Sequence, residues 1–432
     1  MPWSMRNFLA THNLLAVSAQ QREAALNSAQ TLDTTLLVDL TNVLNYHPTR
    51  QGNLEEATGK EEPDRIYDLG GLTRGNLDFS RAQPQHFAFL LAYALGQVNT
   101  SAAGSTGYRH TITPIAGNLD VARSNPSFTA AQRLGQQVMK RRLVSCFVNQ
   151  VKVQFPKDGW AKISGVIKGT GKIDDNTCCE TVPAAYNDSS LTLASHGVEG
   201  SSAAERLSNV QAIKVQNPGT SAWEDVAYTA VSGDSPAVIT ITPPGGSGDI
   251  TSYKVYYLPT ESGWTEFPAR VSEPPLRSTQ LRVNLGGKWT GSAIQGGHVL
   301  ATELRDLSWT LHNQLSIEST PGGGGLYANR AFRRGRSQEL VFDRDFRDFL
   351  MNQHLRDNDT LVVHLKAEGP EYEAGYRYMV EIVFPKVGII SAPTRVTERR
   401  LTESIEFSVL QDDDLGSVLV YVQNQVPGYA LG

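Results

Sequence analysis

The side chains that could do chemistry in this sequence are scattered, with no recognisable catalytic pattern. The chain has no Gly-x-Ser-x-Gly, no His-Glu-x-x-His and no Walker loop, motifs that would position a nucleophile, a zinc ion or a phosphate. His110, His354 and His364 fall on expected strands or helices, where a packed or solvated histidine is the simpler interpretation. We therefore predict no catalytic residue, no metal site and no cofactor, and we expect that the chain is not an enzyme.

Two acidic stretches are the nearest approach to a cation site. QDDDLG (411–416) and DNDT (357–360) each bring carboxylates together, and carboxylate oxygens are ligands that Ca²⁺ prefers. No second cluster of ligands lies near either stretch in sequence, so solvated turns are the favoured interpretation. GGGG (322–325) lacks the Lys-Ser/Thr of a phosphate loop and is read as a flexible loop.

A charge contrast between two loops is more informative. NLEEATGKEEPD (53–64) carries Glu55, Glu56, Glu61 and Glu62. STPGGGGLYANRAFRRGR (319–336) is basic and contains no acid; its arginines are Arg330, Arg333, Arg334 and Arg336. The two loops are either independently solvated or complementary contacts between different subunits, which would set register more than affinity. Phosphate binding by the arginines is a third interpretation, disfavoured because no aromatic platform accompanies them.

Composition limits the class of protein that presents these loops. The chain has 432 residues, 19% charged residues and a net charge of −5, which gives no overall attraction to nucleic acid. The longest apolar run, near 88–96, is too short to span a bilayer, and the N-terminal segment has no clean signal-peptide pattern. Three cysteines, two of them adjacent, form no disulfide framework. We expect a protein without a membrane association, made in a reducing cytoplasm.

The local patterns predict a mainly β fold with a few helices. Short runs rich in Val, Ile, Thr, Tyr and Phe alternate with Gly, Pro, Asn and Asp, as strands and turns do. Helices are predicted at 19–30 from propensity, and at 86–95 and 345–355 from amphipathic spacing.

Four anchor segments occur twice in the same order, which indicates an internal duplication. LVDLTNVL (37–44) corresponds to LRDLSWTL (304–311), and the segment from Arg74 corresponds to that from Arg334. GYRHTITP (107–114) corresponds to GYRYMVEI (375–382). Finally, Arg-Arg-Leu opens a predicted hairpin at 141–169 and again at 399–424.

These repeats divide the chain into four parts. We predict an N-terminal arm with a short helix at 1–30, a first domain at 31–175 and its copy at 285–432. Between them, 176–284 is predicted to be a linker and a small β insertion. The stretch ITPPGGSGDITSYKVYY (241–257) is typical of an immunoglobulin-like or fibronectin-like module.

The duplicated segments resemble the major tail tube proteins of long-tailed bacteriophages. The resemblance rests on LSWTLHNQL, RGRSQELVFDRDFRDFL, YRYMVEIVFPKVGI, LTESIEFSVL and SVLVYVQN in the second copy, and on CFVNQVKVQFPKDGWAKISGVIKGTGK in the first. It covers both copies, about two-thirds of the chain, and leaves 1–30 and the middle segment uncovered. These are patterns of strands and turns, without a catalytic signature.

The resemblance implies two tandem tail-tube-like β-sandwich or partial-barrel domains, each with a flanking helix. It implies self-association into stacked rings, with a trimer of two-domain chains giving pseudo-sixfold symmetry. The implied partners are further copies of the chain, a tape measure protein in the lumen, and tail terminator and distal tail proteins at the ends. Viral DNA would pass through without specific binding. The implied location is the virion tail after assembly in the host cytoplasm, with 206–272 either an outward decoration or part of the second copy's edge.

An adhesin that recognises a cell-surface glycan is the alternative function. It predicts aromatic clusters in loops, for which Trp223, Trp264 and Trp289 are the candidates. A glycan hydrolase would need paired acids, and no such pair stands out in the sequence.

Overall fold

The computed structural model describes residue 11 and residues 13–115, 124–134, 139–232, 236–260, 263–300, 302–323 and 325–431. Within them the chain is mainly antiparallel β-structure, as the sequence predicts. It divides into two compact units. Unit 1 comprises 1–14, 131–142 and 174–267, and unit 2 comprises 15–130, 143–173 and 268–432.

Unit 1 contains the predicted small β insertion, built from two small sheets. The first sheet has the order β11 (Cys178–Ala185), β17 (Ile250–Tyr257), β13 (Val210–Gln216) and β14 (Trp223–Asp225). The second has the order β12 (Ser190–Thr192), β16 (Val238–Ile241) and β15 (Tyr228–Ser232), and the short helix α3 spans Ala203–Asn209. Side chains of both sheets share one core, which includes Ile213, Ile239 and Tyr253. Unit 1 ends at Phe267, before the predicted boundary at 284.

Unit 2 holds the second predicted copy and most of the first, apart from 131–142 and 174–175, around a single hydrophobic core. Its first layer is a sheet in which each strand pairs with the next: β3 (Asn45–Gly52), β4 (Ile66–Phe79), β9 (Lys162–Gly169), β8 (Lys140–Phe155), β22 (Leu304–His312), β25 (Ser337–Asp345) and β29 (Arg400–Val409). β8 belongs to the first copy and β22 to the second, so the sheet continues across the two. The boundary predicted at 285 therefore runs through one core, and descent from a duplicated domain stays a prediction.

The second layer also combines strands of both copies. It has the pairing order β5 (Gly96–Ala103), β6 (Gly107–Pro114), β30 (Leu419–Asn424), β27 (Tyr376–Ser391), β26 (Thr360–Glu373), β18 (Leu281–Leu285) and β21 (His298–Val299). β27 also pairs with β29 through Val387 and Val409, which connects the two layers. Further short strands of the chain are β1 (Leu14–Val17), β2 (Thr34–Leu36), β7 (Phe128–Arg133), β10 (Ile173–Asp175), β19 (Lys288–Trp289), β20 (Ile294–Gln295), β23 (Leu315–Glu318), β24 (Arg330–Arg333) and β28 (Thr394–Thr397).

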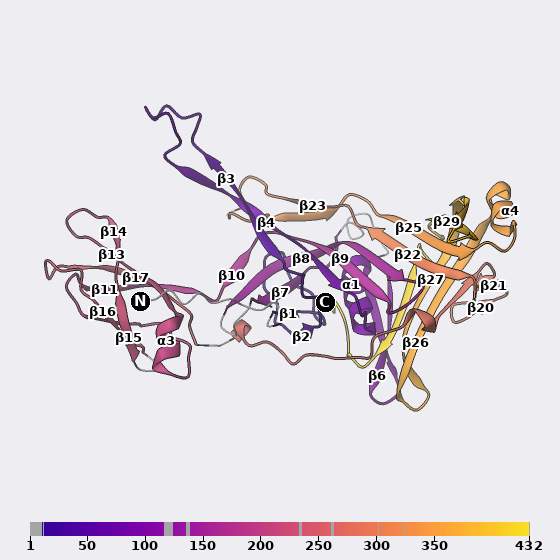
Figure 1. Cartoon of the computed structure of the whole chain (residues 1–432), viewed down its shortest axis with the longest axis horizontal. Helices are drawn as coiled ribbons and strands as arrows, with labels where there is room; N and C mark the ends of the chain where they lie inside the picture. Colours follow the sequence, from indigo (N-terminus) through magenta and orange to yellow (C-terminus); the bar gives the residue numbers. More distant parts are fainter. Residues whose placement is uncertain are drawn as a thin grey trace. The chain divides into compact units, whose positions relative to one another are not determined.

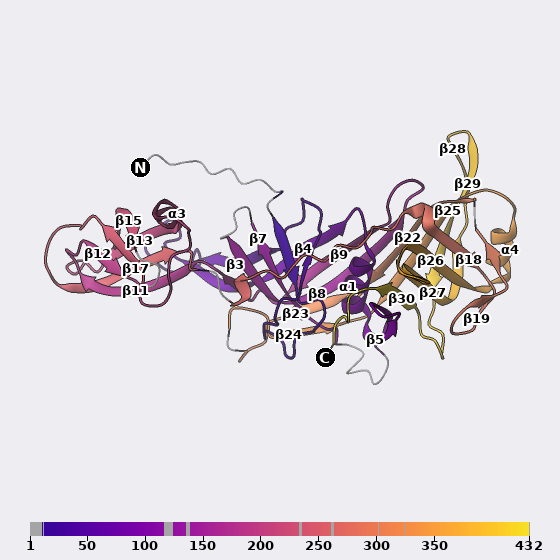
Figure 2. The same ribbon diagram turned by 90° about the horizontal axis from the view of Figure 1, so that it is seen from below.

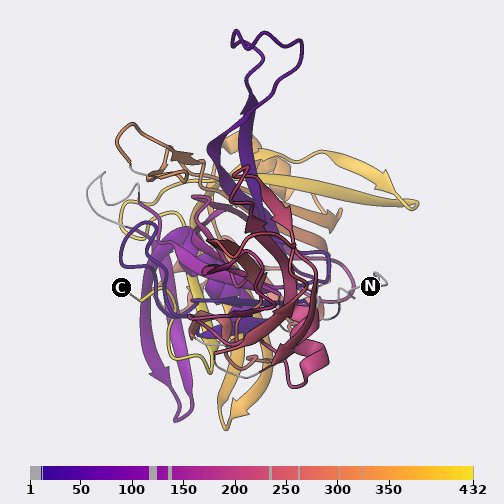
Figure 3. The ribbon, with the colours of Figure 1, turned by 90° about the vertical axis from the view of Figure 1, so that its left-hand side faces the viewer.

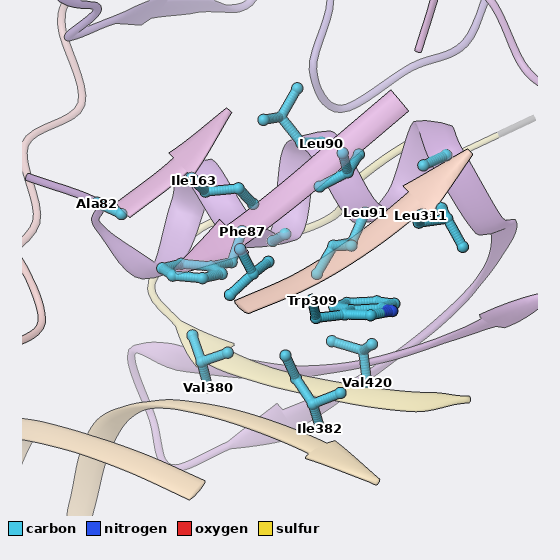
Figure 4. Packing of buried hydrophobic residues seen from close by; sticks show 14 of the residues in the cluster. Ala82, Phe87, Leu90, Leu91, Ile163, Trp309, Leu311, Val380, Ile382 and Val420 are labelled. Carbon is cyan, nitrogen blue, oxygen red and sulfur yellow. The ribbon is translucent and has the colours of Figure 1, made fainter. Parts of the chain in front are cut away.

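Helix α1 (Pro84–Leu95) lies between the two layers and is buried along its whole length. Pro84 opens it at a position that needs no N–H donor, and Gly96, at φ 95°, ends it in the left-handed conformation that a residue without Cβ adopts easily. Figure 4 shows Phe87, Leu90 and Leu91 of this helix among Ile163, Trp309, Val380 and Val420. The predicted helix at 86–95 is thus confirmed, and its uniform burial follows from having a sheet on either side.

The other helix predictions had different outcomes. Helix α4 (Leu350–Asp357) confirms the one expected at 345–355, and only Met351 in it is buried. The helix predicted at 19–30 is absent from the structure. Glu23 is instead buried, and its carboxylate accepts hydrogen bonds from the hydroxyls of Ser127 and Thr129 and from the Ser145 backbone. These long-range bonds fix the segment in an irregular conformation, so tertiary contacts outweigh a weak local propensity.

The two Arg-Arg-Leu segments do not form equivalent hairpins. β8 and β9 pair directly, as predicted for 141–169. β29 and β30 do not pair with each other, contrary to the prediction for 399–424. They lie in succession along β27, where Val387 pairs with Val409 and Val383 pairs with Leu419. The 16-residue β27 is long enough to pair with both.

The two copies nevertheless share one order of elements. β4, α1 and the hairpin β5–β6 occur in the first, and β25, α4 and the hairpin β26–β27 occur in the second. GYR begins the second strand of each hairpin, at Gly107 and just before Tyr376. The first anchor pair is not equivalent, because 304–311 lies in β22 whereas 37–44 is not a strand.

Candidate functional site: the charged hairpins

The acidic loop is the tip of a long hairpin made by β3 and β4, which projects from the rest of unit 2 (Figures 1 and 3). Glu55, Glu56, Glu61 and Glu62 are all exposed there. Buried Asn53 organises the tip: its amide donates to Asp64 at 2.8 Å and its carbonyl accepts from the Asp64 backbone at 3.1 Å. The predicted acidic residues are therefore presented together on an ordered turn.

The base of this arm packs against the loop that precedes the predicted basic cluster. Gly70 has φ 85°, and a Cβ there would lie 2.0 Å from the Leu326 carbonyl oxygen. Gly71 forms a β-bridge with Tyr327, and the Ala328 N–H donates to the Thr170 carbonyl at 2.8 Å. Any side chain at Gly70 would push the arm away from the loop at Leu326. The glycine therefore allows the base of the arm to pack directly against the segment that leads into the basic hairpin.

Two of the four predicted arginines lie on the surface of the hairpin β23–β24. Arg330 and Arg334 are exposed, and their guanidinium carbons lie 4.9 and 6.0 Å from the centre of the Phe332 ring. Arg334 also forms an ion pair with Glu318 at 3.2 Å. An exposed pair of this kind contributes little to stability, which leaves both cations accessible to a partner.

The other two arginines face inward. Arg336 donates to the Ala94 carbonyl and to Asn313, both at 3.1 Å. Burial, with the nearby charge of Arg333, lowers the pKa of Arg336 to about 9. Asn313 donates to the same Ala94 carbonyl at 2.9 Å. A cation at this position stabilises the last turn of α1 through its free carbonyls. No sequence signal identified this role.

The environment of Arg333 is intermediate between those of the exposed and the inward-facing arginines. Its guanidinium is half-buried and contacts the Asn125 side-chain oxygen at 3.5 Å. Desolvation lowers its pKa from the ordinary arginine value. The predicted four-arginine cluster therefore consists of an exposed pair and an inward pair.

A buried ion network that the sequence analysis missed joins α4 to the first layer. Arg344 on β25 is 1% exposed and pairs with fully buried Glu403 on β29 at 2.7 Å. Asn352 of α4 donates to the other Glu403 oxygen at 3.1 Å, and Glu303 lies 3.6 Å from the guanidinium. The network lies near the start of the β28–β29 hairpin, which projects from unit 2 in Figure 2.

Both projecting hairpins expose apolar side chains and unpaired strand edges. Val396 of β28 is 74% exposed, and Leu54 and Ile66 of the β3–β4 arm are each 71% exposed. Among the described residues, β3 pairs only with β4, and β28 pairs only with β29. Free edges and exposed apolar groups together favour association with another chain.

The candidate histidines have packed or paired environments. His110 is fully buried between Thr100 and Asn424, 2.9 and 3.0 Å from its ring nitrogens, and burial lowers its pKa. His364 contacts Glu381 at 2.8 Å, and His354 contacts an aspartate at 2.7 Å.

The acidic turn QDDDLG (411–416) has a local structural role. Asp412 caps it by accepting from the Asp414 and Leu415 backbones, each at 3.0 Å. Within the described ranges, no group of three or more His, Cys, Asp or Glu side chains could hold a metal. Gly324 of the glycine loop lies outside the described residues.

Each of the three tryptophans considered for glycan recognition has contacts within its own unit. Trp289, in unit 2, is 5% exposed and packs against His364 and Tyr421. Trp223 and Trp264 belong to unit 1, where the cations of Lys254 and Arg142 lie 4.3 and 5.0 Å from their ring centres. Their faces are thus partly taken by intrachain cation–π contacts.

Comparison with known proteins gives little further information. No family model matches the chain, and no curated protein matches it. Among solved structures, the chain is similar to a variant of the Hcp1 protein from the E. coli EAEC 042 pathovar, at 11% identity and a TM-score of 0.19. The match covers 34% of this chain and 97% of that one. None of the helices in the described parts is long and apolar enough to cross a bilayer.

Proposed function

We propose that this chain is a structural protein that assembles into rings, which stack to form a bacteriophage tail tube, the conduit for DNA ejection. Each chain supplies two of six similar positions, so three chains close one ring. It is not an enzyme and needs no cofactor. Its partners are other copies of itself, with a tape measure protein in the lumen and terminator and distal tail proteins at the ends. It is assembled in the host cytoplasm and resides in the virion tail.

The observation that carries this proposal is the repeated element order within one continuous sheet. The order β4–α1–β5–β6 in the first copy matches β25–α4–β26–β27 in the second. The two copies share one sheet because β8 of the first pairs directly with β22 of the second, where Leu311 pairs with Val151. A sheet that already passes from one copy to the next inside a chain can pass in the same way to the next chain. Ring closure would then cover the edges that a free subunit exposes. The tail-tube resemblance of the same segments supports this.

The charged hairpins supply the proposed contact between stacked rings. The acidic tip (Glu55, Glu56, Glu61 and Glu62) lies at the end of the projecting β3–β4 arm. We propose that it meets Arg330 and Arg334 of a subunit in the adjacent ring, because these two cations are exposed. Such contacts fix register and weaken as salt rises.

Electron microscopy of negatively stained protein, together with size-exclusion chromatography, tests assembly. Hollow rings or tubes are expected, and a persistent monomer that binds glycans would instead support the adhesin. The combined change Arg330→Glu/Arg334→Glu is expected to shorten the tubes and to lower the salt concentration at which they dissociate. Arg356→Glu/Lys288→Glu makes the same charge change at exposed positions elsewhere in unit 2 and is the matched control. Unchanged tubes in the first variant would refute the proposed contact.

A further inference from the structure

The first layer of unit 2 contains a hollow of about 420 Å³ where β3, β4 and β9 lie side by side (Figure 1). The polar residues that line it are Asn45, His47, Arg74, Asn76 and Lys168, and the others are apolar or glycine. None of these lining residues, all of which belong to the described part of unit 2, carries a carboxylate. The hollow therefore offers positive charge and N–H donors without an acid to neutralise them.

Strand register places the two cations of the hollow directly opposite each other. Arg74 of β4 pairs with Lys168 of β9 on one side and with Asn45 of β3 on the other. Thr73 and Leu77 of β4 are buried, whereas Arg74 is exposed and Lys168 is half-buried. Because side chains alternate across a strand and directly paired residues share a face, all three side chains of this row point away from the core.

The charge of this pair of cations is not neutralised within the described part of the chain. Neither Arg74 nor Lys168 forms an ion pair with a described residue, whereas Arg344 in the same layer pairs with Glu403. Desolvation, together with the charge of Arg74, lowers the pKa of Lys168. The Lys168 ammonium donates to the Leu315 carbonyl at 3.2 Å, which leaves further N–H groups for a ligand. Since like charges directly opposite each other destabilise a sheet, an anion between the two cations would remove an unfavourable interaction.

Gly75 brings the chain at the start of β3 against β4 and so forms one side of the hollow. A Cβ at Gly75 would lie 2.8 Å from the Val43 carbonyl oxygen and 2.8 Å from a methyl carbon of Leu44. Val43 and Asn45, on either side of Leu44, both line the hollow. Because a glycine inside a strand permits another backbone to approach closely, the missing side chain gives the hollow its shape.

The donors that line the hollow match the oxygens of a phosphate group. An arginine guanidinium can donate two parallel hydrogen bonds to a phosphate, and a lysine ammonium adds a compact positive charge. The amides of Asn45 and Asn76 and the imidazole of His47 carry N–H groups that can bind the remaining oxygens.

We propose that Arg74, Lys168 and Asn45 bind a phosphate group in this hollow. The group is either inorganic phosphate or part of a nucleotide or nucleic acid, since all three present the same oxygens to the site. All of these residues belong to one chain, so the site goes beyond the proposed tube function and does not depend on ring assembly.

Isothermal titration calorimetry of the unassembled chain tests this site. Inorganic phosphate, adenosine monophosphate and a single-stranded oligonucleotide without terminal phosphates are titrated separately at constant ionic strength. The test variant is Arg74→Gln/Lys168→Gln, and each single change is also made, so that the assay does not depend on the folding of one protein. The control variant Arg81→Gln/Lys162→Gln removes the same two charges at exposed positions of unit 2, and Lys162 lies on the same strand as Lys168.

The expected result is saturable binding of at least one ligand, weakened at least about tenfold by the test variant and by each single change, and unchanged in the control variant. Binding of phosphate or of the monophosphate identifies a free or terminal phosphate as the ligand, and binding of the oligonucleotide alone identifies backbone phosphates. If no ligand binds, if the test variant binds as the parent does, or if test and control variants lose binding equally, the site is wrong. None of these results bears on whether the chain forms tubes.

Discussion

Glu273 provides a sharp test of the packing at the start of α1. Its side chain is 4% exposed, and one carboxylate oxygen accepts a hydrogen bond from the Gln85 backbone at 2.8 Å. The Gln425 backbone and the Asn424 side chain also lie close to this carboxylate. Burial raises the pKa of Glu273 to about 7, against the usual 4.5. We predict that this carboxyl group makes the free subunit less stable as pH rises, and that Glu273→Gln removes the effect.

The size of the effect follows from the two pKa values. Below about pH 4.5 the group is protonated in both folded and unfolded chains. Between 4.5 and about 7 the folded chain keeps a proton that the unfolded chain has lost, so the free energy of unfolding falls as pH rises. The difference of about 2.5 between the folded and unfolded pKa of Glu273 corresponds to about 3 kcal/mol. His86 is fully buried nearby, and burial lowers its pKa to about 3. The contribution of His86 to the free energy of unfolding therefore rises with pH until the pH reaches 6.5, its usual pKa.

The assay is urea denaturation of the unassembled chain and of Glu273→Gln at about pH 5 and about pH 8. Because His86 is present in both proteins, its contribution cancels in the difference between them. The stability of the native chain relative to the variant should fall by about 2–3 kcal/mol over this interval. A difference that stays constant with pH would refute the reasoning, since Glu273 would then titrate alike in both states.

Two further predictions concern buried arginines. Arg336→Gln should destabilise the unassembled chain by about 1–3 kcal/mol in thermal denaturation, because it removes the charged donor at Ala94, whereas exposed Arg334→Gln should change stability by less than about 0.5 kcal/mol; equal losses would contradict the proposed role at the end of α1. Arg344→Met should cost about 3–5 kcal/mol by leaving Glu403 charged and unpaired in the core. The double change Arg344→Met/Glu403→Leu should recover most of that loss, and a double variant no more stable than the single one would show that lost packing dominates.

Patterns local in sequence predicted much of the secondary structure. Alternating residues in 141–169 identified β8 and β9, and the run at 86–95 identified α1. The helix at 19–30 failed because buried Glu23 binds residues more than 100 positions away, a contact to which local propensity does not respond. The second hairpin failed because β29 and β30 share the long partner β27, and strand pairing is not specified by alternation alone.

The sequence alone determined the β-rich fold, the order of the repeated segments and the contrast between an acidic and a basic loop, because composition and period are local properties of the chain. Tertiary structure decided what those features do. It divided four neighbouring arginines into an exposed pair and an inward pair, with Arg336 at the end of α1. It also placed strands of both copies around one helix. Each of these outcomes depends on which distant segments meet, and a one-dimensional pattern does not contain that information.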